Sequence, residues 1–356
     1  RLRLPVYPFE GERHWPTDEA TPSRFALAPA GEGAYRLHIA PDAPLVADHR
    51  LAGEPVLAAA AQIVIAWRAL ETHTSAGGAH SASGPGESHE SNGSHDSDRS
   101  NDLNDSRHSI DGIDASAATH VALHDIEWLA PIAIGAPTDL HVTLARDEDE
   151  DEDEDRNDDD DRDGDEGAAR FAIAIPPAID TPLGRGRATR AASSRSAAPA
   201  FDIAAIRARC TQPISADACY DAFAAIGIDY GPTFRPLRAL AVGREEVLAE
   251  FDAAALARTT DDARLVALLD GAFQAIAGLQ LADAGRIDGA LLPAALARIE
   301  FVGPLADSVH AWIREVPAAS GRRTFDLDLV TARGARCASL RGLALASGRR
   351  AASRDA

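Results

Sequence analysis

The chain has 356 residues, 45% of them hydrophobic, and a formal net charge of −21 at pH 7. This length favours two folding units with real hydrophobic cores, and the absence of a basic patch with interleaved aromatic residues argues against nucleic-acid binding. Most of the negative charge lies in one tract, because residues 147–166 hold sixteen acidic residues and two arginines and leave a net charge of −7 for the rest.

The three cysteines, Cys210, Cys219 and Cys337, have neither metal-site nor paired spacing. This usage is typical of a reducing compartment rather than of a disulfide scaffold. The sequence from residue 1 is basic but lacks the apolar core of a signal peptide, and no run approaches the roughly 18 apolar residues that span a bilayer. We therefore expect a cytoplasmic protein that binds no membrane.

The first predicted unit covers residues 24–178. It contains the segments "AYRLHIA" and "PLVADHRLAG", then an apolar helix at about residues 56–71, then "THVALHDIEWLAPIAI", "TDLHVTLAR" and "RFAIAI". Alternation of apolar and polar residues in these segments predicts strands. This unit is therefore expected to combine one apolar helix with several strands.

Two segments inside this unit are predicted to lie outside any core. Residues 73–116 are rich in Ser, Gly, Asp, Asn and His, and residues 147–167 form the acidic tract. Such compositions bury too little apolar surface to offset the entropy of ordering, so we expect disordered inserts. Four histidines of the first insert have an irregular spacing that does not favour a metal site: His80, His89, His95 and His108.

The second predicted unit covers residues 201–348, after a linker at 179–200 and before a tail at 349–356. A helix is expected near 215–226, followed by the turn "DYGPTF", the strands "LRALAVGR" and "EVLAEFD", and a long apolar helix at about 264–283. The strands "ARIEFVGPL", "HAWIREVP", "TFDLDLVTA" and "CASLRGLALAS" complete the unit. Each unit thus reads as one buried helix with several antiparallel strands, which predicts an α+β fold with a sheet around a central helix. Two copies side by side would form one continuous sheet.

His49 is the first candidate for chemistry. It ends an extended segment, four residues before Gly53, and a helix follows. The start of that helix offers unpaired backbone N–H groups and a positive dipole end, which can bind a carbonyl oxygen that becomes negative. The residues alone leave two interpretations open: a catalytic base, or an ordinary half-buried histidine at the end of a strand.

Asp270 is the second candidate, because it lies within the apolar stretch "RLVALLDGAFQAIAGLQLA". A buried carboxyl tends to have a raised pKa, which suits a general acid near neutral pH, and Gln274 lies on the same helix face. The alternative is that Asp270 only caps the start of the helix. In "GIDYGPTFR" the Gly231-Pro232 turn fixes Tyr230, which either points its hydroxyl into a pocket or only packs in the core.

These motifs together resemble the dehydratase domains of modular type I polyketide synthases, of the trans-acyltransferase type. "DHRLAGEPVL" resembles the family's histidine motif, "DYGPTFR" its Tyr-Gly-Pro-x-Phe motif and "LLDGAFQA" its Asp-x-x-x-Gln motif. "DIEWLAPIAI" and "LPAALARIEFVGPL" resemble strands of these domains, and "LPVYPFEGERHWP", in residues 1–23, resembles the linker that precedes them. The resemblance runs over about residues 1–348, apart from the inserts, and implies a double hot-dog fold.

The resemblance also implies a reaction and its partners. His49 would remove the C2 proton of a 3-hydroxyacyl thioester and Asp270 would protonate the departing hydroxyl, with Tyr230 and Gln274 orienting that hydroxyl. Gly53 and the backbone N–H of Ala59 would complete the substrate-orienting set. No metal or redox cofactor is expected. The polyketide intermediate would arrive on the phosphopantetheine of an acyl carrier protein, beside a neighbouring ketosynthase and in a possible homodimer.

One departure from the family pattern concerns positions 58 and 59, where Pro-Gly is expected and this chain has Ala58-Ala59. The N–H of residue 59 remains, but a methyl group stands where glycine would let the thioester approach the backbone. Two alternatives therefore stay open: a diverged double hot-dog domain that isomerises double bonds, cyclises or branches the chain, and a non-catalytic scaffold in the same synthase.

Overall fold

The computed structural model describes residues 24–79, 120–146, 168–191, 199–317 and 322–347. We call residues 24–191 the first half and residues 199–347 the second half. The predicted segments 1–23 and 349–356, the acidic insert, and the first insert beyond residue 79 with its histidines lie outside the described residues.

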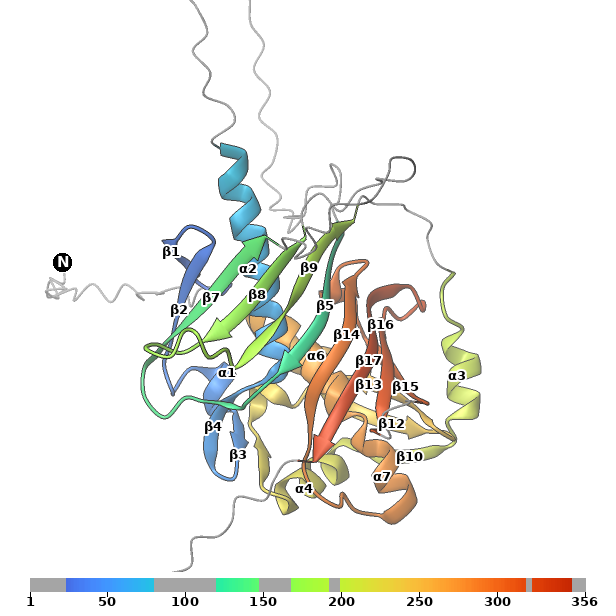
Figure 1. Cartoon of the computed structure of the whole chain (residues 1–356). Helices are drawn as coiled ribbons and strands as arrows, with labels where there is room; N and C mark the ends of the chain where they lie inside the picture. The colour runs from blue at the N-terminus through green and yellow to red at the C-terminus, as the bar shows by residue number, and fades with distance from the viewer. Residues whose placement is uncertain (1–23, 80–119, 147–167, 192–198, 318–321, 348–356) are drawn as a thin grey trace, which may run out of the picture.

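One continuous antiparallel sheet runs through both halves (Figure 1). The halves join where Leu296 lies opposite Ile126, a pairing of strands β14 and β5, so the sequence-based expectation of a continuous sheet is confirmed. In spatial order the strands are β1 (Ala28–Gly31), β2 (Ala34–Ile39), β7 (Thr138–Arg146), β8 (Ala169–Ala174), β9 (Gly184–Ala191), β5 (His120–Trp128), β14 (Leu291–Phe301), β17 (Arg336–Ser347), β16 (Thr324–Val330), β15 (His310–Val316), β13 (Glu246–Phe251), β12 (Leu237–Val242) and β10 (Gln212–Ser215).

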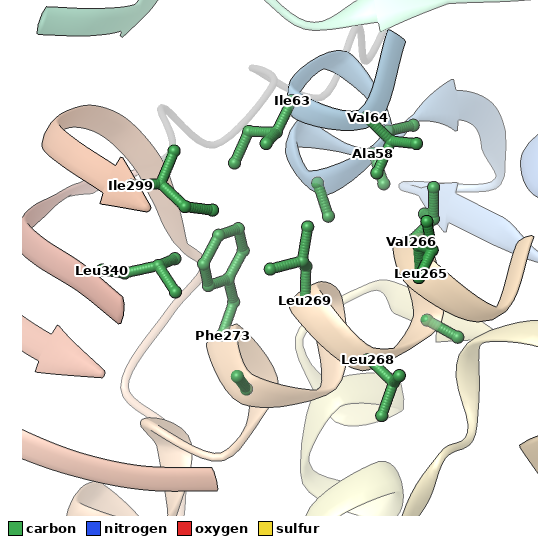
Figure 2. Close-up of a cluster of buried hydrophobic side chains, with 14 of the residues drawn as sticks. Ala58, Ile63, Val64, Leu265, Val266, Leu268, Leu269, Phe273, Ile299 and Leu340 are labelled. Carbon is green, nitrogen blue, oxygen red and sulfur yellow. The ribbon is translucent and has the colours of Figure 1, made fainter. Parts of the chain in front are cut away.

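Each half wraps its part of the sheet around a central helix. In the first half this helix is α2 (Ala59–Ala79), and in the second half it is α6 (Asp261–Gln274), continued by α7 (Ala277–Ala284). Both central helices are apolar on nearly every face because each lies between the sheet and the other helix. Figure 2 shows this contact, with Ile63 and Val64 facing Leu265, Leu269 and Phe273.

The central helices differ from the sequence-based expectation at their ends. The helix expected at 56–71 begins at Ala59 and continues to Ala79, into the predicted insert. The helix expected at 264–283 is two helices, because the N–H groups of Ile276 and Gly278 bond three residues back instead of four. The same stretch, Asp261–Ala284, is the one described segment long and apolar enough to cross a membrane, whereas the sequence predicted none. Its most apolar 18-residue window is 83% buried in the core.

The predicted linker at 179–200 is wrong over much of its length, because strand β9 lies within it and pairs with β5 and β8. From residue 184 to residue 188 its sequence, "GRGRA", alternates small buried residues with exposed arginines. The buried residues must be small, since a Cβ on Gly186 would lie 2.7 Å from the ring of Phe171. A strand whose inward face is glycine and alanine has no large apolar residues that show its two-residue period, so the sequence did not predict it. Because this strand is part of the sheet, the first half extends to at least residue 191.

A second, smaller sheet joins the two halves near the helix starts. Its order is β11 (Ile228–Tyr230), β3 (His49–Leu51), β4 (Glu54–Leu57) and β6 (Ile132–Ala133). Strand β11 comes from the second half and pairs with β3 of the first half. The remaining elements are short: α1 (Pro44–Ala47), α3 (Ile203–Arg209), α4 (Ala216–Ala225), α5 (Ala253–Leu256) and the 3₁₀ turns η1 (Pro232–Phe234) and η2 (Leu305–Asp307).

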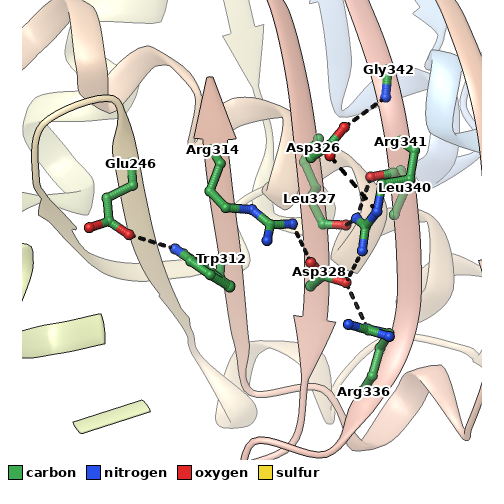
Figure 3. A network of polar contacts seen from close by, with 10 residues as sticks. All are labelled: Glu246, Trp312, Arg314, Asp326, Leu327, Asp328, Arg336, Leu340, Arg341 and Gly342. Atoms are coloured by element: carbon green, nitrogen blue, oxygen red, sulfur yellow. Dashed lines mark hydrogen bonds and ion pairs between the residues drawn. The ribbon is translucent and has the colours of Figure 1, made fainter. Parts of the chain in front are cut away.

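A cluster of charged residues stabilises the sheet of the second half (Figure 3). The side chain of Asp328 on β16 is fully buried and forms ion pairs with Arg314, Arg336 and Arg341. A buried carboxylate with several guanidinium partners keeps its charge compensated, and removal of one member of such a buried group typically costs about 3–5 kcal/mol. This cluster holds three neighbouring strands together.

Candidate active site

His49 lies at the start of β3, half-buried, where β3 meets β11. Its Nδ1 is 2.9 Å from the carbonyl oxygen of Val56. Because a carbonyl oxygen can only accept, Nδ1 must carry the proton in the neutral ring, and Nε2 keeps its lone pair. The ring lies against Tyr230 and Phe234, with centroid distances of 5.5 and 5.0 Å. The neutral imidazole is thus oriented with one nitrogen free to accept a proton.

The β3–β4 hairpin brings Val56 back to His49. Its two turn residues, Ala52 and Gly53, have φ angles of +52° and +82°, and Leu51 lies opposite Glu54. Two positive φ angles in a two-residue loop are the signature of a type I′ turn, which is why glycine suits position 53. Gly53 is exposed at the end of the hairpin, roughly 10 Å along it from His49, so the structure does not bring it to the other candidate residues.

The start of helix α2 follows β4 after a single residue. Ala58 accepts hydrogen bonds from the N–H groups of Ala61 and Gln62, at 3.0 and 3.3 Å. Among the residues that the structure describes, no acceptor meets the N–H of Ala59 or Ala60. The indole N–H of Trp128 holds the carbonyl oxygen of Ala59 at 3.3 Å. Two unpaired donors and the positive end of the helix dipole therefore stand next to the strand that orients His49.

Asp270 comes from the interior of α6 and is only 5% exposed. The alternative that it caps the helix start is wrong, because α6 begins at Asp261 and Thr260 is its N-cap. The amide Nε2 of Gln274 donates to Oδ2 of Asp270 at 2.7 Å and to the carbonyl oxygen of Phe234 at 3.0 Å. Burial raises the pKa of the Asp270 carboxyl, against smaller lowering effects of the nearby His49 and of the Gln274 hydrogen bond.

Tyr230 lies directly opposite His49 in the β11–β3 pairing. Its ring also contacts Tyr220 and Phe223 of α4, with centroid distances of 6.1 and 5.2 Å. Burial, and after it the charge of Asp270, raises the pKa of the Tyr230 hydroxyl well above its ordinary value. The hydroxyl therefore stays protonated and remains a hydrogen-bond donor.

Phe234 connects the two titratable groups. Its fully buried ring contacts His49, and its backbone carbonyl accepts from the amide that also holds Asp270. The structure thus gathers His49, Tyr230, Asp270 and Gln274 around one residue of the second half. A half-exposed imidazole with a free nitrogen and a buried carboxyl with a raised pKa are suited to act as a base and an acid.

The sequence reasoning did not identify Asp48 as part of this region. Its Oδ2 accepts from the N–H and the hydroxyl of Thr233, at 3.0 and 2.6 Å, and its carbonyl oxygen accepts from the N–H of Gly231 at 2.7 Å. Two features of the sequence could have indicated this contact: an aspartate next to His49, and a Gly-Pro-Thr turn whose backbone N–H groups need hydrogen-bond acceptors. Among the described residues no cluster of three or more His, Cys, Asp or Glu side chains forms a possible metal site.

A family model described as the polyketide synthase dehydratase N-terminal domain matches residues 198–355. Polyketide synthase ThaG of Burkholderia thailandensis is 29% identical over 96% of the chain, which corresponds to 6% of that protein. Polyketide synthase PksN of Bacillus subtilis is 32% identical over 41% of the chain, or 3% of that protein. The chain therefore spans only a small part of the length of these curated relatives.

Two solved structures have the same fold over nearly their whole length. A trans-AT PKS dehydratase domain from Brevibacillus brevis is 21% identical, with a TM-score of 0.65 over 92% of this chain and 98% of that one. The dehydratase domain of RzxB from Pseudomonas fluorescens is 24% identical, with a TM-score of 0.62 over 91% and 98%. The expected double hot-dog fold is confirmed by these likenesses together with the observed sheet.

Proposed function

We propose that this chain is a polyketide synthase dehydratase domain, as its similarities to such proteins support, and that it removes water from a 3-hydroxyacyl thioester to give an enoyl thioester. One observation carries the proposal. An imidazole whose Nε2 is free and a buried carboxyl whose pKa is raised come from different halves and meet at Phe234. An elimination of this kind needs one group that takes a proton and another that gives one.

His49 acts as the base. Its Nε2 takes the C2 proton, which the neighbouring thioester carbonyl makes acidic, and the Val56 carbonyl stabilises the imidazolium through the Nδ1 proton. Negative charge then develops on the thioester oxygen. The unpaired N–H of Ala59 donates to this oxygen, with the N–H of Ala60 beside it, and one such donor is typically worth about 3 kcal/mol. The methyl group of Ala59 leaves this donor in place.

Asp270 acts as the acid. Its raised pKa keeps the carboxyl protonated at pH values where an exposed aspartate is ionised, and it gives this proton to the C3 hydroxyl as the C3–O bond breaks. The hydroxyl leaves as water and the electrons of the C2–H bond form the double bond. Gln274 Oε1 is buried and meets no hydrogen-bond partner in the described part of the chain. It accepts a hydrogen from the departing group, and Tyr230 orients that group.

The steps move only protons and one leaving hydroxyl, so the atoms balance without a metal or redox cofactor. The imidazolium loses the C2 proton and the carboxylate regains one before the next turnover. In this proposal the acyl group enters on the phosphopantetheine of an acyl carrier protein in a larger synthase, next to a ketosynthase. The homodimer and the cytoplasmic location stay predictions.

Turnover of a pantetheine-bound (3R)-hydroxyacyl thioester by the purified chain tests the proposal. We expect a product that is lighter by one water molecule and carries a C2–C3 double bond, detected by mass spectrometry. A double-bond isomerase would change the position of an existing double bond without any change in mass, and a scaffold would leave the substrate unchanged. Either of these results would contradict the proposed elimination.

A further inference from the structure

We infer that Asp48 is a positioning residue that fixes the base and the acid relative to each other across the two halves. This inference rests on the proposed function, because it concerns the geometry of that reaction. Asp48 hydrogen-bonds neither His49 nor Asp270 among the described residues; its side chain and its carbonyl oxygen contact residues 231–233 of the second half.

The main chain at Asp48 is held firmly. Asp48 is the C-cap of α1, and its backbone N–H reaches the carbonyl oxygens of Pro44 and Val46. The next residue is His49, whose ring is tied to Val56. The Asp48 carboxylate therefore projects from a fixed point one residue away from the base.

The contacts of Asp48 with the second half are close and specific. Both hydrogen bonds of Thr233, from its N–H and from its hydroxyl, end on the same oxygen, Oδ2. A Cβ built on Gly231 would lie 2.2 Å from Oδ1 and 2.4 Å from Cγ of Asp48. The carboxylate thus occupies the space beside Gly231 that any other residue would fill, so glycine at position 231 is required by this contact.

The turn held by Asp48 leads directly to the acid. Gly231 is the N-cap of the 3₁₀ turn η1, and its carbonyl oxygen accepts from the N–H of Phe234 at 3.0 Å. Phe234 then contacts His49 with its ring and Gln274 with its carbonyl oxygen, and Gln274 holds Asp270. Displacement of the turn would move Phe234 away from both groups. The β3–β11 pairing would still join the halves, but it holds only residues 228–230 and not the turn itself.

Four variants test this inference. Asp48→Ala removes the acceptor of both Thr233 bonds, and Thr233→Val removes the hydroxyl. Asp48→Asn is the conservative variant, because a carboxamide oxygen at the Oδ2 position can accept both bonds. Asp202→Ala is the matched control, since Asp202 accepts one backbone N–H at 2.9 Å as the N-cap of α3, on the outer side of the second half.

Two readouts separate positioning from a loss of stability. The first is kcat and KM with the pantetheine-bound 3-hydroxyacyl thioester: Asp48→Ala should lower kcat by about 100-fold, the effect of a displacement of about 1 Å in a reacting group, with little change in KM. Thr233→Val should have a smaller effect in the same direction, and Asp48→Asn should restore most of kcat. Asp202→Ala should lower the melting temperature without changing kcat.

The second readout needs no turnover. The pKa of the Asp270 carboxyl, followed by ¹³C NMR without substrate, should fall in Asp48→Ala because water reaches the carboxyl once the turn shifts, and it should stay at the wild-type value in Asp48→Asn and Asp202→Ala. If Asp48→Ala keeps the wild-type kcat and the wild-type Asp270 pKa, the inference is wrong. If the wild-type chain shows no turnover but Asp48→Ala still lowers the Asp270 pKa, the proposed function fails and the positioning role of Asp48 stands.

Discussion

The two halves of the molecule share a sheet and a central helix, but they place their titratable groups differently. The first half carries His49 on a strand outside its helix, half-buried, with the Val56 backbone carbonyl as its hydrogen-bond partner. The second half carries Asp270 inside its helix, 5% exposed, with a side-chain amide as its partner. The central helix of the first half is also unbroken. In the second half the backbone N–H groups just after Gln274 bond the carbonyl oxygen three residues back instead of four, which divides the central helix in two.

This difference explains how two halves with the same fold can provide one group that accepts a proton and another that donates one. A half-exposed imidazole that donates to a carbonyl oxygen keeps a free lone pair, whereas a carboxyl in an apolar helix resists ionisation and keeps its proton. In the proposed reaction, the environment, rather than the residue type alone, makes the histidine of the first half the base and the aspartate of the second half the acid. Substitutions that remove one environment at a time can break this assignment.

The largest effect is expected from His49→Asn. The asparagine amide can still donate to the Val56 carbonyl in place of Nδ1, so the hairpin should keep its shape while the basic Nε2 is lost. We expect kcat to fall by about 10⁴-fold, the upper range for a general base, with little change in melting temperature. Turnover close to that of the wild type would show that His49 is not the base.

Asp270→Asn should lower kcat by about 10³-fold, since the amide cannot donate the proton that the leaving hydroxyl needs. The same change should raise stability at neutral pH. Burial raises the pKa of Asp270 in the folded state, so the unfolded chain ionises first and the wild type loses stability as the pH rises from about 3.9 toward the folded pKa. The asparagine variant does not have this loss.

Thermal unfolding at several pH values checks the second part of this prediction. The melting temperature of Asp270→Asn should exceed that of the wild type at pH 7, and the two should converge below about pH 4, where Asp270 is protonated in both states. An asparagine variant that is less stable than the wild type at pH 7 would mean that the carboxylate is compensated in the folded chain.

Ala59→Pro tests the helix start of the first half. Proline is accepted at the first helical position, and it removes the N–H that we assign to the thioester oxygen. Loss of one such donor typically lowers kcat by about 10²–10³-fold. Ala59→Gly is the matched control, because it keeps the N–H and removes only the methyl group. Equal rates for the proline and glycine variants would exclude this donor.

Gly53→Ala should have the smallest effect on turnover. A methyl group at this position meets nothing within 4 Å, but the φ of +82° is unfavourable for alanine, which costs roughly 1–2 kcal/mol of stability. We expect a lower melting temperature in thermal unfolding and an unchanged kcat. A large fall in kcat at unchanged stability would instead support the sequence-based role of Gly53 in orienting substrate.

The positions of His49 and Asp270 as candidate residues could be read from the sequence, because a histidine before a helix and an aspartate in an apolar helix each stand out locally; their catalytic roles stay predictions. Strand β9 could not be read from it, since its buried residues are glycine and alanine. The pairing of β11 with β3 was also out of reach, because it joins three-residue strands about 180 positions apart that show no period of their own. The Nδ1 proton of His49 and the contacts of Asp48 depend on this pairing and on the hairpin, so neither could be derived before the structure.

The most direct test of the central claim is a comparison of kcat for the wild type, His49→Asn, Asp270→Asn and the double variant with a pantetheine-bound (3R)-hydroxyacyl thioester. Groups that act in one elimination are strongly non-additive. We expect both single variants to lose nearly all turnover and the double variant to be scarcely slower than the slower of the two. A loss of kcat in the double variant that equals the product of the two single losses would contradict the claim that one base and one acid from the two halves remove water together. Full turnover by either single variant would contradict it as well.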